Sequence, residues 1–377
     1  MTALLLERAS PAATKLPLIS IIGPVRNEAP FIAATLTQLF AQDYPAERYE
    51  VLVADGGSTD DTRAIVLRLA RGRPNLRLLD NPGGWSSAGR NVAARAARGE
   101  VVLLIDGHCE IRNRRYLADL ADAFATGADC VGRPQPLDVT GATPLQRAIA
   151  AARSSRLGHH PASHIYSDRE GFVAPDSVAV AYRREVFDRV GWFDEAFDAC
   201  EDVEFNHRLR RANLRCWFTP RVAVRYHPRD SLAGLFRQMV RYGRGRVRLL
   251  RKHPDTFSPA SLVPGAFVAG LLAGPALACL LSALGLVYLG AVAAYALLVL
   301  GFSLAIAARE REPRLAAWCP LVFATVHLGA GWGLLREAVT PNDGSVSGGR
   351  PEPAAPAVLA FPGTAGHAEP APQRRAA

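Results

Sequence analysis

The sequence has very little lysine and no cysteine motif. Only Lys15 and Lys252 are lysines among the 44 basic residues, so the net charge of +9 reflects a bias toward arginine and is weak evidence for an anionic partner. The six cysteines include no C-x-x-C pair, which indicates neither a zinc site nor a small disulfide scaffold and fits a reducing compartment. Glu7 and Arg8 interrupt the short apolar run at the N-terminus, so no signal peptide is predicted.

Charged residues are absent from two long segments near the C-terminus. Residues 256–308 form an uncharged stretch of 53 residues, and residues 315–335 form another of 21. Because a membrane-crossing helix needs about 20 apolar residues, the first stretch predicts two spans joined near residues 285–288, and the second is a candidate third span. Buried helices of a soluble domain are the alternative, although core helices rarely run so long without a polar face. His327 makes the third helix atypical, so its crossing stays open.

The basic residues that flank these segments predict their orientation. Residues 236–254 carry seven basic and no acidic side chains, and residues 309–314 add three arginines. Basic loops stay on the cytoplasmic side, so we expect the N-terminal domain in the cytoplasm. The segment before the first span is predicted to be a basic interfacial helix with its arginines on lipid phosphates. The apolar residues expected to face lipid are Leu235, Phe236, Met239, Val240, Val247 and Leu249.

Residues 18–225 alternate strand-like and helix-like runs, which is typical of an α/β domain. Near-continuous apolar strands separated by helices indicate a mostly parallel sheet that is covered on both faces. The expected strands are residues 18–23, 50–54, 76–79 and 101–105. In such sheets ligands bind beyond the carboxyl ends of the strands. Three polar clusters are thereby placed side by side: PVRNE (24–28), DGGSTDDT (55–62) and DGHCE (106–110).

Each cluster alone also has a purely structural interpretation. Ser58 and Asp61 have the spacing of a capping box, so this cluster is also typical of a helix start. Asp106 followed by Gly107 is typical of a turn. Asn27 and Glu28 could likewise do no more than begin the helix that follows. None of these explanations accounts for Asp55 and Asp106 both following apolar strands at one edge of the sheet. The combination indicates a shared ligand site.

Taken in order, these stretches resemble the inverting glycosyltransferases of family 2, which have the Rossmann-like GT-A fold with a mostly parallel mixed sheet. The resemblance covers about residues 17–225, and the matching stretches are ISIIGPVRNE, VLVADGGSTDDT, SAGRNVAARAARG, LLIDGH, AYRREVFDRVGWFDEAF and CEDVEFNHRLR. The DGH variant, the QMVRYGRGR segment and the apolar C-terminus are most similar to the membrane-anchored succinoglycan-biosynthesis type of bacterial exopolysaccharide glycosyltransferase. A hexosyltransferase in the bacterial inner membrane is implied.

The resemblance implies a nucleotide-binding role for residues of the first two clusters. Asp55 matches the aspartate that accepts a hydrogen bond from the uracil ring, a base-selective contact for a carboxylate. Pro24, Arg26 and Glu28 match the loop that wraps the nucleoside. Arg90 matches an arginine near the base and the diphosphate. A surface arginine on an exposed helix is the alternative interpretation of Arg90.

The third cluster matches the metal-binding motif of the family. Asp106 corresponds to the first aspartate of D-x-D, which binds the divalent ion on the donor diphosphate, and His108 replaces the second aspartate. Imidazole is acceptable to Mn2+ but suits Mg2+ poorly, because Mg2+ favours oxygen ligands. We therefore expect Mn2+ or Mg2+ to be held by Asp106 and the diphosphate, with His108 as a ligand or close neighbour. An ordinary polar residue after a strand is the alternative interpretation of His108.

Two further motifs match the catalytic and acceptor parts of the family. Glu201 and Asp202 match its E-D pair, whose aspartate is the general base; an inverting transfer needs such a base but no covalent nucleophile. Acids at a helix start also complement the helix dipole, which is the structural alternative. Gln238, Arg241 and Tyr242 stand where related synthases carry Q-x-x-R-W, and we expect them near the acceptor or the diphosphate.

The sequence thus predicts five segments: an N-terminal extension (1–16), a GT-A domain (17–230), a basic interfacial helix (231–255), two to three transmembrane helices (256–336) and a disordered tail (337–377). The predicted reaction moves a sugar from a UDP-sugar to a polyprenyl-diphosphate-linked saccharide at the surface of the membrane lipids. A polyprenyl-phosphate sugar transferase and a catalytically inactive, nucleotide-sensing membrane protein are the alternatives. A nucleic-acid partner is disfavoured, because the basic cluster abuts a span and lacks interleaved aromatic residues.

Overall fold

The structure is a computed structural model that describes residues 16–159, 164–280 and 282–340. Most of the predicted N-terminal extension and of the predicted tail lies outside the described residues. Residues 337–339, which we expected in the tail, instead form the last turn of helix α11 (Leu315–Val339). This turn is helical because its buried Glu337 pairs with Arg244 and Arg248 of another helix, α8 (Leu232–Lys252).

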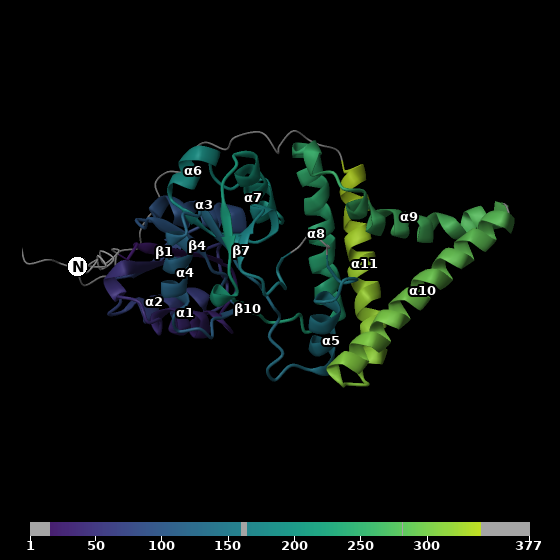
Figure 1. The fold of residues 1–377 in the computed structure, drawn as a ribbon, viewed down its shortest axis with the longest axis horizontal. Helices are drawn as coiled ribbons and strands as arrows, with labels where there is room; N and C mark the ends of the chain where they lie inside the picture. The colour runs from purple at the N-terminus through teal and green to yellow at the C-terminus, as the bar shows by residue number, and fades with distance from the viewer. Residues whose placement is uncertain (1–15, 160–163, 281, 341–377) are drawn as a thin grey trace, which may run out of the picture.

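An eight-stranded mixed sheet forms the centre of the N-terminal domain, in the order β3-β2-β1-β4-β8-β6-β9-β7 (Figure 1). The four strands expected from the sequence are parallel neighbours, and β8 runs antiparallel to β4 and β6. The strands are β1 (Ile19–Val25), β2 (Tyr49–Asp55), β3 (Leu76–Asp80), β4 (Val101–Leu104), β6 (Cys130–Gly132), β7 (Gly171–Val173), β8 (Ala179–Arg183) and β9 (Cys216–Phe218).

Helices cover both faces of the sheet, as the apolar strands predict. Successive side chains of a strand point to opposite faces, so Ile21 lies in one core and Ile22 in the other. Helices α1, α2 and α4 pack on the first core, and helices α3, α6 and α7 pack on the second. These helices are α1 (Ile32–Phe40), α2 (Thr62–Ala70), α3 (Ser86–Ala96), α4 (Tyr116–Ala125), α6 (Glu185–Val190) and α7 (Glu201–Arg211).

Several short elements complete the domain. A two-stranded antiparallel ladder joins β5 (Cys109–Glu110) to β10 (Arg225–Tyr226), so Tyr226 lies beside the segment that follows β4. Helix α5 (Pro144–Arg153) packs against α11. Single 3-10 turns occur at Ala46–Arg48, Pro175–Ser177, Pro220–Val222 and Pro254–Thr256.

The described C-terminal residues contain three helices long and apolar enough to cross a membrane, with mean hydropathy of 1.9, 2.3 and 1.3. They are α9 (Pro259–Leu280), α10 (Ser282–Glu310) and α11. Figure 1 shows α9 and α10 extending away from the sheet domain as a hairpin. Helix α9 ends at Leu280 and α10 begins at Ser282, so the expected join near residues 285–288 was wrong. Residues 285–288 belong to α10 because the Tyr288 ring packs over Gly274 of α9.

Helices α8 and α11 lie side by side, and glycine lets their backbones meet (Figure 1). A Cβ atom added at Gly243 would overlap a backbone carbonyl of α11, and one added at Gly333 would overlap a backbone carbonyl of α8. Leu235, Met239 and Leu249, which we expected to face lipid, are buried inside the protein. Leu235 and Met239 share their apolar cluster with α11, so that expectation was wrong for this side of α8.

Candidate active site

The first two polar clusters are hydrogen-bonded to each other at the end of the sheet. The Asn27 amide donates to Ser58 Oγ at 2.9 Å, and the Thr59 amide donates to Asn27 Oδ1 at 2.8 Å. Asn27 adopts the left-handed conformation with a φ of 57°, which turns the chain back toward the second loop. Asp61 at the start of α2 makes no side-chain cap hydrogen bond. The capping-box interpretation of this cluster is therefore wrong, because Ser58 binds Asn27 and Asp55 instead.

Asp55 ends β2 with its side chain fully buried. Its Oδ2 accepts from the amides of Gly57 and Ser58 at 3.2 Å and forms an ion pair with Arg63 at 2.9 Å. Arg63 also pairs with Asp80 at the end of β3. The carboxylate thus holds the loop between β2 and α2 in place. A nucleobase that bound Asp55 would donate to a carboxylate that already accepts from these groups.

Arg90 of α3 lies at the centre of the site. The residue is only 8% exposed, so the surface interpretation is wrong. Its Nη1 lies 3.0 Å from Glu201 Oε1 and its Nη2 lies 3.8 Å from Asp106 Oδ1, while the guanidinium stacks over Phe193. Burial lowers the pKa of Arg90, but the charges of Glu201, Asp106 and Asp202 outweigh it and raise the pKa further above its ordinary value. Arg90 therefore joins the third cluster to the acid pair.

Asp106 follows β4 and faces the same space as Arg90. Its Oδ2 accepts a hydrogen bond from the Tyr226 hydroxyl at 3.0 Å. Burial raises the pKa of Asp106, but Arg90, His108 and the Tyr226 bond outweigh it and leave the pKa below its ordinary value. The fully buried Arg133 donates to the Leu104 carbonyl at the end of β4 and keeps a second positive charge nearby. The carboxylate is consequently held in its ionised form.

His108 is held by Glu28 rather than being free in solvent. The His108 Nδ1 lies 2.9 Å from Glu28 Oε1, which leaves Nε2 available to a ligand. Burial lowers the pKa of His108, but the Glu28 bond and the Asp106 charge outweigh it and raise the pKa. Histidines that bind metals commonly give their other nitrogen to a carboxylate. The donor set of Asp106 and His108 therefore fits a divalent ion that tolerates nitrogen, and Glu28 turns toward this pair.

The acid pair begins α7 directly after a left-handed residue. Cys200 has a φ of 65°, a conformation that is uncommon for residues other than glycine and that recurs at active sites. Glu201 is buried against Arg90, whereas Asp202 is half-buried. Burial raises the pKa of Glu201 and the Asp202 charge adds to this effect, although Arg90 opposes it. Asp202 is accordingly the member of the pair that a substrate reaches more easily.

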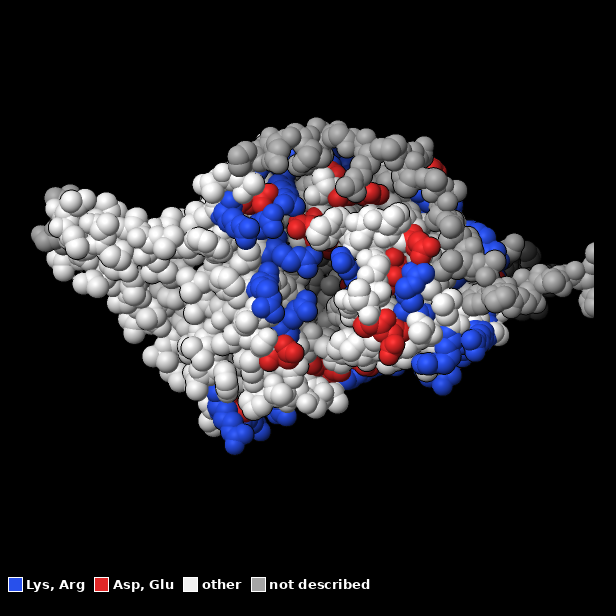
Figure 2. Space-filling view, turned by 180° about the vertical axis from the view of Figure 1, so that it is seen from behind, with Lys and Arg blue, Asp and Glu red and all other residues white. Residues whose placement is uncertain are grey.

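The Q-x-x-R-Y segment of α8 lies against the loop that leads into α7. Arg241 donates to the Asp198 carbonyl at 2.6 Å, and Gln238 donates to the Tyr242 hydroxyl at 3.1 Å. The Cys200 thiol lies 3.9 Å from the Tyr242 carbonyl. Figure 2 shows Lys and Arg side chains gathered around a hollow between the sheet domain and the white, uncharged helices. The structure therefore brings the expected acceptor residues next to the acid pair.

The remaining nucleotide-binding candidates lie at the end of β1. Pro24 packs against α3 near Gly89, and the exposed Arg26 reaches toward Gly84 in the loop before α3. Strand β1 separates β2 from β4, so Asp55 and Asp106 end strands that lie two spacings, roughly 10 Å, apart. All three polar clusters thus share one edge of the sheet.

Two functional candidates have no motif in the sequence. Tyr226 reaches Asp106 from a two-residue strand, which carries no periodic signal. Arg133 directly follows the short apolar strand β6, and an arginine in that position was the only available signal. Both residues contact the site through distant chain segments that only the folded structure brings together.

Comparisons with known proteins identify the family of the chain. Residues 20–191 match the model of glycosyl transferase family 2, and residues 114–309 match that of glycosyl transferase family group 2. The chain is 34% identical over 84% of its length to the succinoglycan biosynthesis protein ExoA of Rhizobium meliloti and covers 94% of that protein. It is 29% identical to the glycosyltransferase AglE of Haloferax volcanii, over 62% of this chain and 74% of that protein.

A solved structure has the same fold. The mannosyltransferase PcManGT of Pyrobaculum calidifontis, in complex with GDP-Man and Mn2+, matches with a TM-score of 0.53 at 23% identity, covering 84% of this chain and 88% of that one. At this identity the match shows the fold alone. The family models and the identity to ExoA go further: the chain belongs to glycosyltransferase family 2, and its α/β domain has the GT-A fold.

Proposed function

We propose that this glycosyltransferase inverts configuration while it moves a sugar from a UDP-sugar to a lipid-linked saccharide, in exopolysaccharide or cell-envelope glycan synthesis. One observation carries the proposal: Arg90 lies between Asp106 and the acid pair, within 3.8 Å of Asp106 and 3.0 Å of Glu201. Arg90 therefore links the residue assigned to the leaving diphosphate to the acid pair that includes the general base, so both would line one pocket. Similarity to a succinoglycan biosynthesis protein supports the pathway class.

The donor is assigned to the edge formed by β1, β2 and β4. Pro24 and Arg26 would line the nucleoside, and Asp55 would accept from the uracil imide while it keeps its loop in place. Glu28 has a second task in this assignment, because its carboxylate orients His108. Arg90 would bind the diphosphate from the α3 side, where its charge is shared with the two acids.

A divalent ion, Mn2+ or Mg2+, fits the pair of Asp106 and His108. The solved mannosyltransferase relative holds Mn2+, and the carboxylate–histidine set here favours that ion over Mg2+. When bound, the ion supplies counter-charge to the departing diphosphate. The protein contributes an ionised Asp106, which Tyr226 and Arg90 stabilise, and an imidazole that Glu28 keeps in one orientation.

Asp202 is assigned as the general base. It would take the proton from the acceptor hydroxyl as that oxygen bonds to the anomeric carbon and the carbon–oxygen bond to the diphosphate breaks. One displacement from the opposite face inverts the configuration. Glu201 stays against Arg90 and fixes the start of α7, which positions Asp202.

The acceptor is assigned to the side of α8. Gln238, Arg241 and Tyr242 lie beside the loop before α7, so a polyprenyl diphosphate could present its sugar to Asp202 from that direction. The hairpin of α9 and α10 extends from this end of the domain and would anchor it in the bacterial inner membrane as a multi-pass protein. The catalytic domain would then lie in the cytoplasm, as the basic flanking residues indicate.

The decisive experiment incubates membranes that contain the full chain with labelled UDP-sugars and extracted lipid-linked saccharides. Asp202→Asn should lower transfer by about 100-fold or more and retain donor binding, because only the base is removed. Asp188→Asn on the exposed side of α6 is the matched control and should transfer normally. Normal transfer by Asp202→Asn would overturn the base assignment. Release of the labelled sugar by mild acid as a monosaccharide, rather than attached to the acceptor saccharide, would instead identify a polyprenyl-phosphate sugar transferase.

A further inference from the structure

A cluster of potential metal ligands lies outside the proposed catalytic site. His207 of α7 is close to His253 and Asp255, which lie in the segment between α8 and α9. Their ligand atoms lie within 4.8 Å of one another, and the two imidazole rings are also 4.8 Å apart. His207 is 1% exposed and His253 is 8% exposed. The cluster joins the C-terminal half of α7 to the start of the apolar hairpin.

The buried Nε2 of His207 points to a missing ligand. It makes no hydrogen bond within the described residues, although it lies 3.2 Å from Asp255 Oδ2. This distance is short enough for an ion pair, but the angle that a hydrogen bond from the Nε2–H group requires is absent. The separation of these two atoms is that of two ligands bound to one ion. With zinc bonds of about 2.0 Å, adjacent tetrahedral ligand atoms lie roughly 3.3 Å apart.

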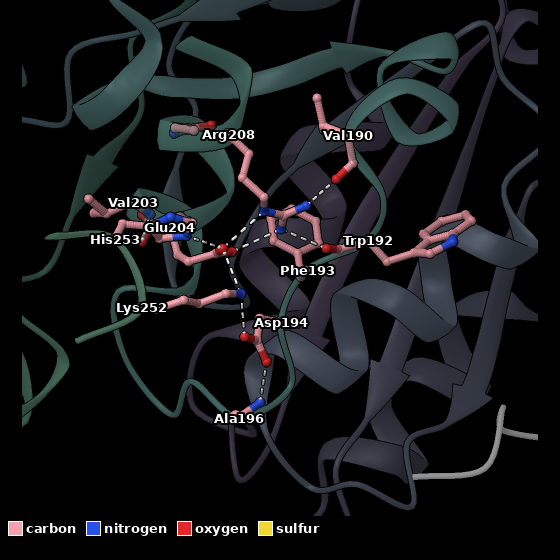
Figure 3. A network of polar contacts seen from close by, with 12 residues as sticks. Val190, Trp192, Phe193, Asp194, Ala196, Val203, Glu204, Arg208, Lys252 and His253 are labelled. Atoms are coloured by element: carbon pink, nitrogen blue, oxygen red, sulfur yellow. Dashed lines mark hydrogen bonds and ion pairs between the residues drawn. The ribbon is translucent and has the colours of Figure 1, made fainter. Parts of the chain in front are cut away.

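Each histidine also has a carboxylate near its other nitrogen, which is a common arrangement around metal-binding histidines. His253 Nε2 lies 2.9 Å from Glu204 Oε1, so Nδ1 is left for a ligand (Figure 3). Asp176 Oδ1 lies 3.6 Å from Nδ1 of His207, which leaves Nε2 facing Asp255. Each ring therefore keeps one nitrogen that its neighbouring carboxylate does not occupy.

Several of the neighbouring cations are already paired with acids. Lys252 contacts Glu204 and Asp194, and Arg208 binds both carboxylate oxygens of Glu204, as Figure 3 shows. Arg210 lies 3.5 Å from Asp176. These pairs reduce the repulsion that a bound dication would meet. Asp255 is exposed, so a water molecule can complete the ligand set from solvent.

We propose that His207, His253 and Asp255 bind a divalent transition ion of the zinc class, with water as the fourth ligand. Two nitrogens and one oxygen suit Zn2+ far better than Mg2+. This ion is separate from the one assigned to Asp106. It fastens α7, whose first turn carries the acid pair, to the segment that enters α9, and it therefore serves as a structural clamp between the catalytic domain and the apolar hairpin.

The test measures metal content of the detergent-purified full chain after equilibration with Zn2+ and removal of excess ion. The wild-type chain should retain one zinc ion, and His207→Gln and His253→Gln should each lose it. His164→Gln, a change at an exposed histidine outside the cluster, should retain it. Asp106→Asn should retain it as well, which separates this site from the donor site. Because no sugar substrate enters the assay, failure of the proposed transfer reaction would not affect the outcome.

Because the histidine variants could fold poorly, zinc affinity is also measured, by competition with a chromophoric chelator, on a variant that should fold normally. Asp255→Asn changes only an exposed carboxylate and should keep the wild-type circular dichroism spectrum, yet weaken zinc binding by at least about tenfold. Wild-type chain that binds zinc no more tightly than the His207→Gln/His253→Gln double variant would overturn the proposal. So would equal zinc affinity of wild type and Asp255→Asn.

Discussion

Gly245 of α8 packs directly against the loop that carries the chain into the acid pair. A Cβ atom at this position would lie 2.8 Å from the Ala199 carbonyl oxygen and 2.8 Å from Cys200 Sγ, where ordinary contacts begin at 3.4 Å. Restoring an ordinary contact in Gly245→Ala therefore takes a shift of about 0.6 Å (3.4 minus 2.8) between α8 and this loop. The Ala199 contact is with backbone, so a change of rotamer cannot relieve it.

The expected effect is larger on activity than on stability. Overpacking costs about 1 to 3 kcal/mol, and the better helix propensity of alanine offsets up to about 1 kcal/mol of this. A displacement approaching 1 Å in a group that aligns reactants lowers rates by about 100-fold, so we expect a 10- to 100-fold loss here. The shift acts on the residue two positions before Glu201, which makes kcat the affected parameter.

Gly301→Ala is the matched control, because nothing lies within 4 Å of a Cβ atom at that position in α10. It should transfer sugar at the wild-type rate and unfold at the same temperature or slightly higher. The assays are steady-state transfer in detergent and thermal unfolding followed by tryptophan fluorescence. If Gly245→Ala matched Gly301→Ala in kcat, the contact between α8 and the loop would have no role in placing the acid pair.

Three further changes test the site and the sheet. Arg90→Ala should lower the free energy of unfolding by about 3 to 5 kcal/mol, seen as a lower melting temperature, because the buried Glu201 and the partly buried Asp106 lose their partner; an unchanged melting temperature would contradict the ion pairs. Glu28→Gln should weaken Mn2+ binding, measured by electron paramagnetic resonance, by about 10- to 100-fold, because His108 loses its carboxylate; equal affinity would contradict that support. Burial raises the pKa of Glu50, but Ser20 and Arg77 help to outweigh this effect and lower the pKa from 4.5. The ionised Glu50 therefore stabilises the fold fully above about pH 4.5, and this contribution is lost as the pH falls through the lowered pKa. Acid unfolding of Glu50→Gln should therefore be less steep below pH 4.5, and a slope equal to that of wild type would count against it.

The sheet and its ligand edge were predictable because their signals are local. Strand β2 was expected at residues 50–54 and spans Tyr49–Asp55, since a run of apolar residues buried on both faces has no other stable place. The order of parallel strands then brings Asp55 and Asp106 to the same edge. Motif spacing could not reveal that Arg90 is the residue between the two halves of the site, because its partners lie far away in the sequence.

The α8–α11 contact shows where composition alone is insufficient. The uncharged stretch 315–335 ends two residues before Glu337, whose carboxylate binds Arg244 and Arg248 of α8. Hydrophobicity cannot distinguish a helix that faces lipid all round from one that faces another helix on one side, because both are apolar. Glycine spacing carries the missing information, since residues without side chains permit backbones to meet.

These contacts join α8 both to α11 and to the loop before α7, and this has a consequence for the reaction. Glycines seat α8 on α11, Arg248 links Glu337 of α11 to Asp198, and Arg241 donates to the carbonyl of the same Asp198. Asp198 lies three residues before Glu201. A displacement of α11 relative to the sheet domain must therefore be absorbed in α8 or passed to the loop before the acid pair. The packed glycines leave little room within the α8–α11 contact, so the loop is where such a displacement reaches the site.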